Sequence, residues 1–320
     1  MKLLRLFPDQ PKLHFVRYRH IAVGLSIAVI LAAFVLLFTR GLNFGIDFKG
    51  GIAMEVTTSG PADVSGLREQ LGGLNLGEVT IQQFGAADDV LIRVSQPKDA
   101  PEGTDQIIVG KIKAALGDKV QYQKVDIVGP QVSGELVNQG VIAVVLAVCL
   151  MFVYIAFRFE WQFGLGAVLG LAHDVLATVF VFSVFQLEFD LTTIAALLTI
   201  IGYSMNDKVV VFDRMRENLR KYKKMDLGEV IDLSVNETLS RTLMTALTTL
   251  IALVSLFVFG GEVVRIFTFT MIFGVFVGTY SSIYIGAPVL MAIGVKRDWS
   301  GNAKKPAADA AKPAKSPKKA

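Results

Sequence analysis

The chain contains six long segments in which apolar residues follow one another with almost no charged positions between them. These segments cover residues 21–39, 137–157, 163–187, 191–212, 241–259 and 264–295. Each segment is close to or longer than the ~20 residues that a helix needs to cross a bilayer. The polar segments between them differ in length, and the longest covers residues 40–136. The pattern predicts six transmembrane helices, with a folded polar domain (40–136) between the first helix (21–39) and the remaining bundle (137–295).

The segment 40–136 has a pattern of its own, in which alternating strand-like stretches and helical stretches follow one another. "GIAMEVTTS" alternates as a strand does, and "ADVSGLREQLGGL" has helical spacing that ends at a glycine pair. "VTIQQFG" and "DVLIRVSQ" predict a hairpin, "TDQIIVGKIKAALG" predicts a second helix, and "VQYQKVDIVG" predicts a last strand. This βαββαβ order predicts a small α+β, ferredoxin-like domain. Its charges are mixed, so we interpret it as a binding or lever module.

Basic residues gather on one side of the predicted membrane helices. The leader 1–20, the loop 213–236 and the tail 296–320 are rich in Lys and Arg, whereas the short loops on the opposite side hold a single Arg. By the positive-inside bias, both termini are predicted to be cytoplasmic and the domain 40–136 periplasmic. The Lys/Ala/Pro-rich tail is predicted to be disordered near anionic headgroups. The apolar spacing in 227–239 predicts a separate short helix at the cytoplasmic interface.

The composition supports a membrane protein and gives no sign of an enzyme. Hydrophobic residues make up 52% of the chain and charged residues 19%, against about 25% charged residues in soluble domains. A single cysteine and three scattered histidines offer neither a disulfide nor a metal site. No phosphate-binding loop with a Gly-Lys-Ser/Thr ending is present, so an ATPase is not expected. We expect no catalytic residue, cofactor, bound metal or nucleic-acid partner.

Polar groups interrupt the apolar segments at three places. His173 and Asp174 lie in the third segment, Asn206 and Asp207 in the fourth, and Arg241 at the start of the fifth. Each charged residue costs about 2.5–3.5 kcal/mol to insert at the centre of a membrane helix. At 1.5 Å per residue, the predicted depths below the outer surface are roughly 24 Å for Asp207 and roughly 27 Å for Arg241. The two side chains can therefore meet.

Two interpretations of these charges remain open. Asp207 and Arg241 can form a structural pair, although apolar residues stabilise a core at lower cost. Alternatively they mark a proton path, with Thr245 as a supporting polar group on the face of Arg241. The Gly and Thr stripes on the same helices are typical of close helix packing. Lys208 and Asp213 are predicted to lie at the inner membrane interface, where a Lys side chain can extend to water.

Four motifs together resemble the SecF members of the SecD/SecF family of bacterial protein-export membrane proteins, which are relatives of the RND transporters. They are "FGIDFKGG" (44–51), "VGPQVSGEL" (128–136), "AHDV" (172–175) and "IGYSMNDKVVVFDRMREN" (201–218). The resemblance covers about residues 15–295 and includes the order of six helices with one outer domain after the first.

The resemblance implies a function and a set of partners. It implies an RND-like half in the bacterial cytoplasmic (inner) membrane that, with SecD, uses the proton-motive force to promote polypeptide export. The family's proton-relay aspartate falls on Asp207 and its arginine on Arg241; Asp174 is included in the predicted relay, with Asn206 and His173 as supporting polar groups. The expected partners are SecD, the SecYEG channel, YajC, YidC and the translocating unfolded polypeptide.

The glycine-containing junctions have two interpretations each. Gly50 and Gly51 on one side, and Gly129 and Pro130 on the other, are either plain turns or hinges that connect the outer domain to the membrane helices. Two competing functions also remain open. One is an RND-like pump for a small molecule, and the other is a non-transporting scaffold that stabilises SecD and the channel.

Overall fold

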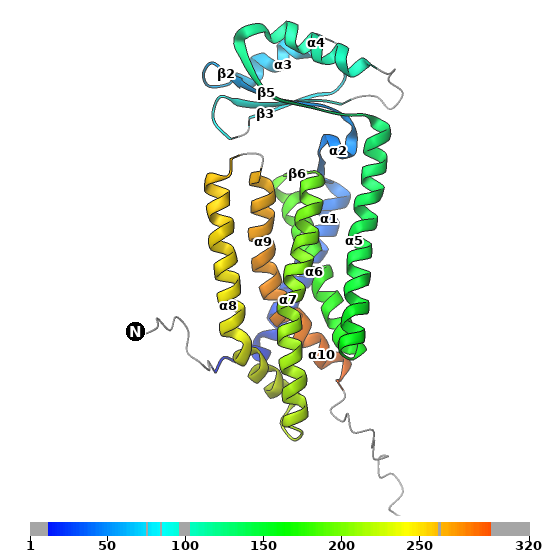
Figure 1. The fold of residues 1–320 in the computed structure, drawn as a ribbon, viewed down its shortest axis with the longest axis vertical. Helices are drawn as coiled ribbons and strands as arrows, with labels where there is room; N and C mark the ends of the chain where they lie inside the picture. The colour runs from blue at the N-terminus through cyan, green and yellow to red at the C-terminus, as the bar shows by residue number, and fades with distance from the viewer. Residues whose placement is uncertain (1–11, 75, 84, 96–102, 262–263, 296–320) are drawn as a thin grey trace, which may run out of the picture.

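The computed structural model describes residues 12–74, 76–83, 85–95, 103–261 and 264–295. It consists of a bundle of long helices with a small sheet domain placed at one end (Figure 1). Most of the predicted basic leader and the whole predicted tail 296–320 lie outside the described residues, so those predictions stay untested.

Six helical spans in the described chain are long and apolar enough to cross a membrane, as predicted. A short 3-10 turn (Val16–Tyr18) leads into the first of them. The helices are α1 (Arg19–Thr39), α5 (Pro130–Arg158), α6 (Trp161–Phe185), α7 (Leu191–Lys221), α8 (Leu227–Phe259) and α9 (Arg265–Ser281), the last continued by a π-helical segment (Ser282–Gly286) and α10 (Ala287–Ile293). About half of the apolar window is buried in α6, α7 and the α9 span (50%, 50% and 44%), against 17% or less in α1, α5 and α8. The helices α6, α7 and α9 therefore form the interior of the bundle.

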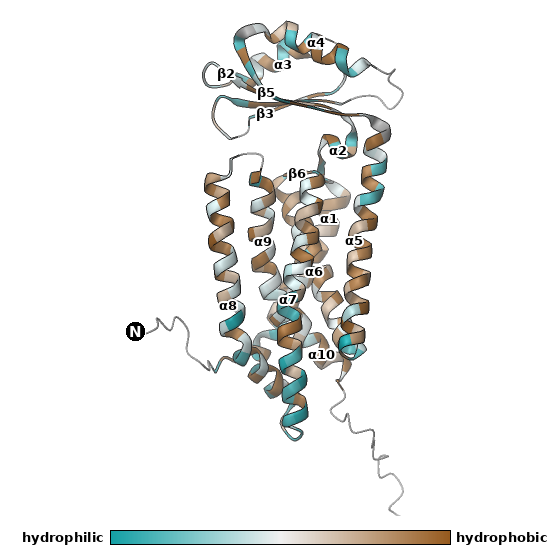
Figure 2. Cartoon of the chain, viewed as in Figure 1, coloured by the Kyte–Doolittle hydropathy of each residue, from teal (hydrophilic) through white to brown (hydrophobic). Residues whose placement is uncertain are grey.

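The outward-facing helices are covered with apolar side chains. Figure 2 shows hydrophobic residues along most of α1, α5 and α8, and hydrophilic residues at the end of α7 that is remote from the sheet domain. Apolar side chains that face outward at this length are suited to lipid or to another membrane protein. The hydropathy along the helices therefore defines a membrane layer across the bundle.

The helix α8 differs from its prediction. The separate interfacial helix expected over 227–239 does not exist, because α8 is one continuous helix from Leu227 to Phe259. No Gly or Pro occurs between residues 229 and 259, and polar residues such as those in "NETLSR" lower hydropathy without breaking a helix. The lower hydropathy of residues 227–239 thus indicates a more polar environment at one end of a single helix.

The π-helical segment interrupts the last span at a position that the sequence explains. Pro288 lacks an amide hydrogen and its ring crowds the carbonyl four residues earlier, so regular α-helical bonding cannot continue through this point. The π-helical segment begins at Ser282 and ends at Gly286, immediately before α10. Such one-turn insertions in α-helices are frequent at functional sites.

The outer domain contains four antiparallel strands and two helices in the predicted βαββαβ order along the chain. The elements are β2 (Gly51–Thr58), α3 (Val64–Gly72), β3 (Val79–Gln83), β4 (Asp89–Val94), α4 (Thr104–Leu116) with a short 3-10 turn (Gly117–Lys119), and β5 (Val120–Val128). The spatial strand order is β3-β4-β2-β5. Figure 1 shows α3 and α4 on the face of the sheet turned away from the bundle. Alternate residues of β2 and β4, including Ile52, Met54 and Ile92, are fully buried beneath these helices.

A small joint connects the outer domain to the bundle. It consists of β1 (Asn43–Phe44), α2 (Ile46–Lys49) and β6 (Glu188–Phe189), and β1 pairs in parallel with β6. Asp47 on α2 accepts a hydrogen bond from the backbone amide of Leu191, the first residue of α7, at 3.0 Å. The chain that enters the outer domain is therefore bonded directly to the loop between α6 and α7.

Candidate functional site

The carboxylate of Asp207 lies where three elements of the bundle meet. Asp207 is on α7; Thr242 of α8 donates a hydrogen bond to its Oδ1 atom at 2.5 Å, and Ser282 of the π-helical segment donates to Oδ2. The residue is half-buried. One acid thus connects α7 with both neighbouring helices.

Arg241 is near Asp207 but does not form an ion pair with it in the described chain. The two residues share the wall of a small cavity of about 10 Å³, which is close to the lower limit for one water molecule. The side chain of Arg241 is largely exposed on the outer face of α8. The cavity is lined by Tyr203, Asn206, Asp207, Val210, Arg241, Thr242, Thr245 and Thr279. The predicted proximity of the two residues is therefore present.

A second polar cluster lies in the interior of the bundle, one residue further along α7. Lys208 and Asp174 have fully buried side chains, and the Lys208 Nζ atom lies 3.0 Å from Asp174 Oδ2. Nζ also donates to Ser204 and, at 2.8 Å, to Ser281 of α9. Ser204 in turn donates to Asp174 Oδ2 at 2.5 Å. All three ammonium hydrogens have acceptors, which is the condition under which a buried charge is tolerated.

The prediction for Lys208 is therefore wrong. It was expected to extend to the inner interface, but its side chain points inward between α6 and α9. The reason is visible on α6, where a Cβ atom added at Gly170 would lie 2.4 Å from the Lys208 Cε atom. The missing side chain of Gly170 provides the space for the lysine. Adjacent residues of a helix point about 100° apart, so Asp207 and Lys208 belong to two separate sites.

The supporting polar residues divide between the two sites. Asn206 and Thr245 line the cavity beside Asp207, although the Thr245 hydroxyl donates to the backbone carbonyl of Arg241 at 2.9 Å. His173 belongs to the interior cluster, with its Nδ1 atom 3.3 Å from Asp174 Oδ1 and its ring 5.8 Å from the ring of Tyr280. Asp174 is therefore close to a cation, but this cation is Lys208.

The two predicted hinges differ in geometry. Gly50 and Gly51 have φ angles of +74° and +126°, and a Cβ atom at Gly51 would lie 2.3 Å from a carbonyl oxygen of β4. Both positions are suited to glycine alone. Gly129 has an ordinary φ of −66° and open space around it, and Pro130 is the first residue of α5. Proline at this position is typical of a helix start.

An ion pair joins the outer domain to the loop between α6 and α7. Arg93 on β4 donates to the carboxylate of Glu188 on β6 through its Nη2 atom. Burial raises the pKa of Glu188 above its ordinary value, and the nearby Arg93 guanidinium opposes this increase only in part. The two residues are 95 positions apart in the chain, so no local sequence pattern predicts their contact.

The residues that sequence reasoning missed are mainly hydroxyls. Thr242 and Ser282 donate to Asp207, Ser204 donates to Asp174, and Ser281 accepts from Lys208. Ser204 lies one helical turn before Lys208, but no charged residue lies within a turn of Ser281 or Ser282. Among the described residues, no group of three or more His, Cys, Asp or Glu side chains is arranged to hold a metal ion. The side chains at these sites donate and accept hydrogen bonds.

Comparison with known proteins shows that the chain is similar to bacterial protein-export membrane proteins. A family model described as protein export membrane protein SecD/SecF, C-terminal, matches residues 108–296, and a SecD/SecF GG motif matches residues 35–62. The chain is 47% identical over 302 residues to the protein translocase subunit SecF of Cereibacter sphaeroides, covering 92% of this chain and 93% of the relative. It is 45% identical over 288 residues to the SecF subunit of Rickettsia rickettsii, covering 90% and 94%.

Solved structures show the same similarity. The crystal structure of SecDF, a translocon-associated membrane protein from Thermus thermophilus, superposes with a TM-score of 0.81 at 34% identity over 90% of this chain. A super-membrane-facing form of SecDF gives a TM-score of 0.66 over the same share. The chain spans 39% of the length of each SecDF chain.

Proposed function

Because the chain belongs to the SecD/SecF family of protein-export membrane proteins, we propose that it acts with SecD to convert the proton-motive force into polypeptide export, with Asp207 as the group that binds the proton. The single observation that carries this proposal is the position of the Asp207 carboxylate between α7, α8 and the π-helical segment. A change in its charge changes the contacts among three elements at once.

The hydrogen bonds of Asp207 suggest how a proton alters the bundle. The ionised carboxylate accepts hydrogen bonds from both Thr242 and Ser282. A protonated carboxyl group carries a hydrogen that must itself be donated, so one of the two hydroxyls has to turn away or find another acceptor. Ser282 lies at the start of the π-helical segment, where helical bonding is already irregular. Protonation therefore favours a movement of this segment relative to α7.

The energies involved are comparable. One elementary charge that crosses 100 mV yields about 2.3 kcal/mol. A hydrogen bond to a charged group contributes about 1.5–3 kcal/mol. The free energy from one proton is therefore about that of one hydrogen bond at Asp207, which corresponds to a tens-fold shift of a two-state equilibrium. The joint formed by β1, α2 and β6 offers a path from α7 to the outer domain.

The exposed side of this site supports SecD as the partner. Asn206 and Arg241 face outward from α7 and α8 at the level of Asp207, where lipid would be a poor environment for them. A second helical bundle with polar groups at this level would cover them. In the proposed assembly both termini are cytoplasmic, the outer domain is periplasmic, and SecYEG, YajC, YidC and the unfolded polypeptide are further partners at the bacterial inner membrane.

The proposal is tested by export into vesicles that contain this chain, SecD and the SecYEG channel. After ATP-driven insertion, export is measured with and without an imposed proton gradient. The Asp207→Asn variant should lose the gradient-dependent part. Glu229→Gln is the matched control, because it neutralises a carboxylate at an exposed position of the neighbouring helix α8.

Two results would contradict the proposal. If Asp207→Asn retains gradient-dependent export, Asp207 is not the proton-binding group. If the wild-type chain stimulates export equally with and without a gradient, the non-transporting scaffold is the better description. Stimulation of small-molecule efflux in place of export would favour the pump.

A further inference from the structure

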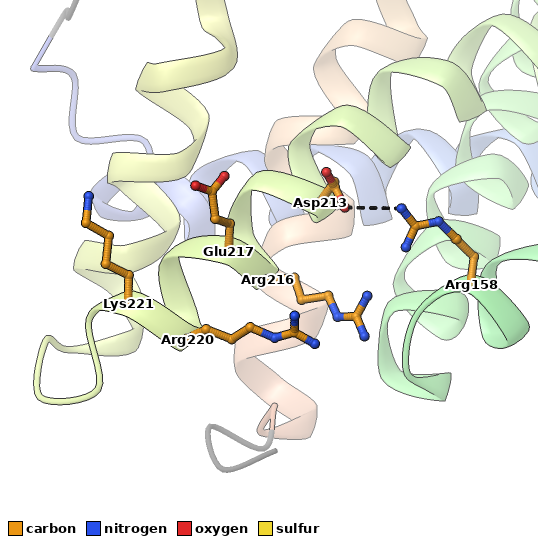
Figure 3. Close-up of a pocket in the computed structure, with 6 residues that line it drawn as sticks. All are labelled: Arg158, Asp213, Arg216, Glu217, Arg220 and Lys221. Carbon is orange, nitrogen blue, oxygen red and sulfur yellow. Dashed lines mark ion pairs between the residues drawn. The ribbon is translucent and has the colours of Figure 1, made fainter. Parts of the chain in front are cut away.

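A large open pocket lies at the end of the bundle that is remote from the outer domain. It has a volume of about 570 Å³ and lies between the end of α5 and the last turns of α7 (Figure 3). The proposed proton site does not include any of its residues. The pocket is lined by Arg158, Asp213, Arg216, Glu217, Arg220 and Lys221. Volumes of about 300–1,000 Å³ are usual for small-molecule sites.

The length of α7 places this pocket at the level of lipid headgroups. The helix begins at Leu191 on the side of the outer domain, and about 20 residues suffice to cross the hydrocarbon layer. Crossing ends near Val211, so the following turns, from Asp213 to Lys221, lie at the membrane surface. Arg158 ends the apolar helix α5 at the same level, and Trp161, at the start of α6, is 57% exposed. Tryptophan is enriched at this interface.

The basic side chains of the pocket converge. Figure 3 shows the guanidinium groups of Arg216 and Arg220 extending from α7 toward the side of Arg158, while Glu217 points the other way. The aromatic ring of Phe159 lies beneath two of these cations, 5.0 Å from Arg158 and 5.8 Å from Arg216. Contact with the ring holds both guanidiniums in place. The arrangement is a preformed cluster of forked hydrogen-bond donors.

The carboxylate contacts of Arg158 and Arg216 are longer than charge-assisted hydrogen bonds. Arg158 lies 3.7 Å from Asp213, and Arg216 lies 3.6 Å from Glu160, whereas a charge-assisted hydrogen bond spans about 2.7–2.9 Å. The Nε atom of Arg216 is buried and has no hydrogen-bond partner within the described chain. Leaving a buried donor without an acceptor is unfavourable. Four cations and two carboxylates line the pocket, so its charge favours an anionic acceptor.

We propose that this pocket binds the phosphate group of an anionic phospholipid. Guanidinium groups match phosphate oxygens in two-point contacts, and Lys221 adds a cation at the rim. Basic pockets between membrane helices on this side are suited to acidic headgroups. The acyl chains would lie along α5, where Val153, Tyr154 and Phe157 are exposed by 58%, 52% and 94%. The lipid would connect the end of α5 to α7, the helix that carries Asp207.

Binding is measured on the purified full-length chain in nanodiscs of phosphatidylcholine, titrated with phosphatidylglycerol, with the rise in melting temperature as the readout. The Arg158→Gln/Arg220→Gln variant should weaken phosphatidylglycerol binding by at least tenfold. The matched control is Lys223→Gln/Lys224→Gln, which removes the same charge from exposed residues of the next loop. It should change binding by less than threefold. Lys221→Gln, at an exposed position, should weaken binding by a smaller factor without affecting folding.

Further arms separate the sources of phosphate. Inorganic phosphate at millimolar concentration should give no more than a small shift, because it lacks the acyl chains. If inorganic phosphate raises the melting temperature as much as phosphatidylglycerol does, the ligand of the pocket is a soluble anion and not a lipid. Equal losses in the pocket variant and the loop control would show general surface attraction and overturn the site. Absence of phosphatidylglycerol binding by the wild-type chain would also overturn it, and would leave an acidic segment of a partner protein as the occupant.

Discussion

Replacing Lys208 by methionine would remove the cation from the interior cluster while keeping an unbranched side chain. The side chains of Lys208 and Asp174 are both 0% exposed, so Asp174 would remain as a buried carboxylate beside neutral groups. Breaking a buried ion pair by removing one partner costs about 3–5 kcal/mol, because the remaining charge stays desolvated. That is a large share of the ~5–15 kcal/mol by which folded domains are stable. We expect Lys208→Met to lower the free energy of unfolding by about 3–5 kcal/mol.

The Asp174→Asn/Lys208→Met double variant removes both charges and keeps a side chain of the same shape at residue 174. Its amide group can accept the hydrogen bond that Ser204 now donates to Asp174. The double variant should therefore recover at least half of the stability lost by Lys208→Met. The recovered stability, at least about 1.5–2.5 kcal/mol, lies within the range of interaction energies for residues in contact.

The assay is a double-mutant cycle of unfolding on the purified chain in a fixed lipid composition. A loss of less than about 1 kcal/mol for Lys208→Met, or simple additivity of the two single variants, would refute the coupling. The same variants examine Asp174 as a relay residue. A stable double variant that lacks gradient-driven export would support that role, and one with normal export would make Asp174 structural.

Three further predictions concern glycines and the domain joint. Gly51→Ala should destabilise the outer domain by about 1–3 kcal/mol because of its φ of +126°, whereas Gly129→Ala should shift melting very little; equal effects would contradict the geometry. Gly170→Ala should cost about 1–3 kcal/mol by displacing the buried lysine, and an unchanged melting temperature would show that the cluster has spare room. The raised pKa of Glu188 means that the folded chain binds this proton more tightly than the unfolded chain does, so stability should increase as the pH falls from the raised value toward 4.5. Thermal unfolding across this pH range should show the increase in stability in the wild type but not in Glu188→Gln. In Arg93→Gln the same increase should begin at a higher pH. Identical pH profiles for the three proteins would show that Glu188 does not cause the pH dependence.

The outer domain could be predicted closely because its signals are local. Alternation of apolar residues and glycine stops define each strand and helix within a few residues, and β2 is observed over Gly51–Thr58 where the sequence predicted a strand. The position of six spans follows equally from local hydropathy. The contact between Arg93 and Glu188 could not be predicted, because it depends on how two separately folded parts meet.

The membrane sites were predicted in part for a related reason. Depth along a helix follows from residue counting, so Asp207 and Arg241 were expected at one level and line one cavity. The direction of Lys208 depends on which neighbouring helix has space, and this requires the packing of Gly170 against α7. Residue counting along α7 alone therefore does not predict the direction of the Lys208 side chain. The serine and threonine partners were missed because hydroxyls occur throughout these helices.

In the proposed function, Asp207 gains and loses a proton within the bundle. Infrared difference spectroscopy between acidic and neutral pH, on the chain reconstituted with SecD, observes carboxyl protonation directly. If Asp207 binds the proton, a protonated-carboxyl band should be absent in Asp207→Asn and retained in Glu229→Gln. Identical spectra for the wild type and Asp207→Asn would contradict it.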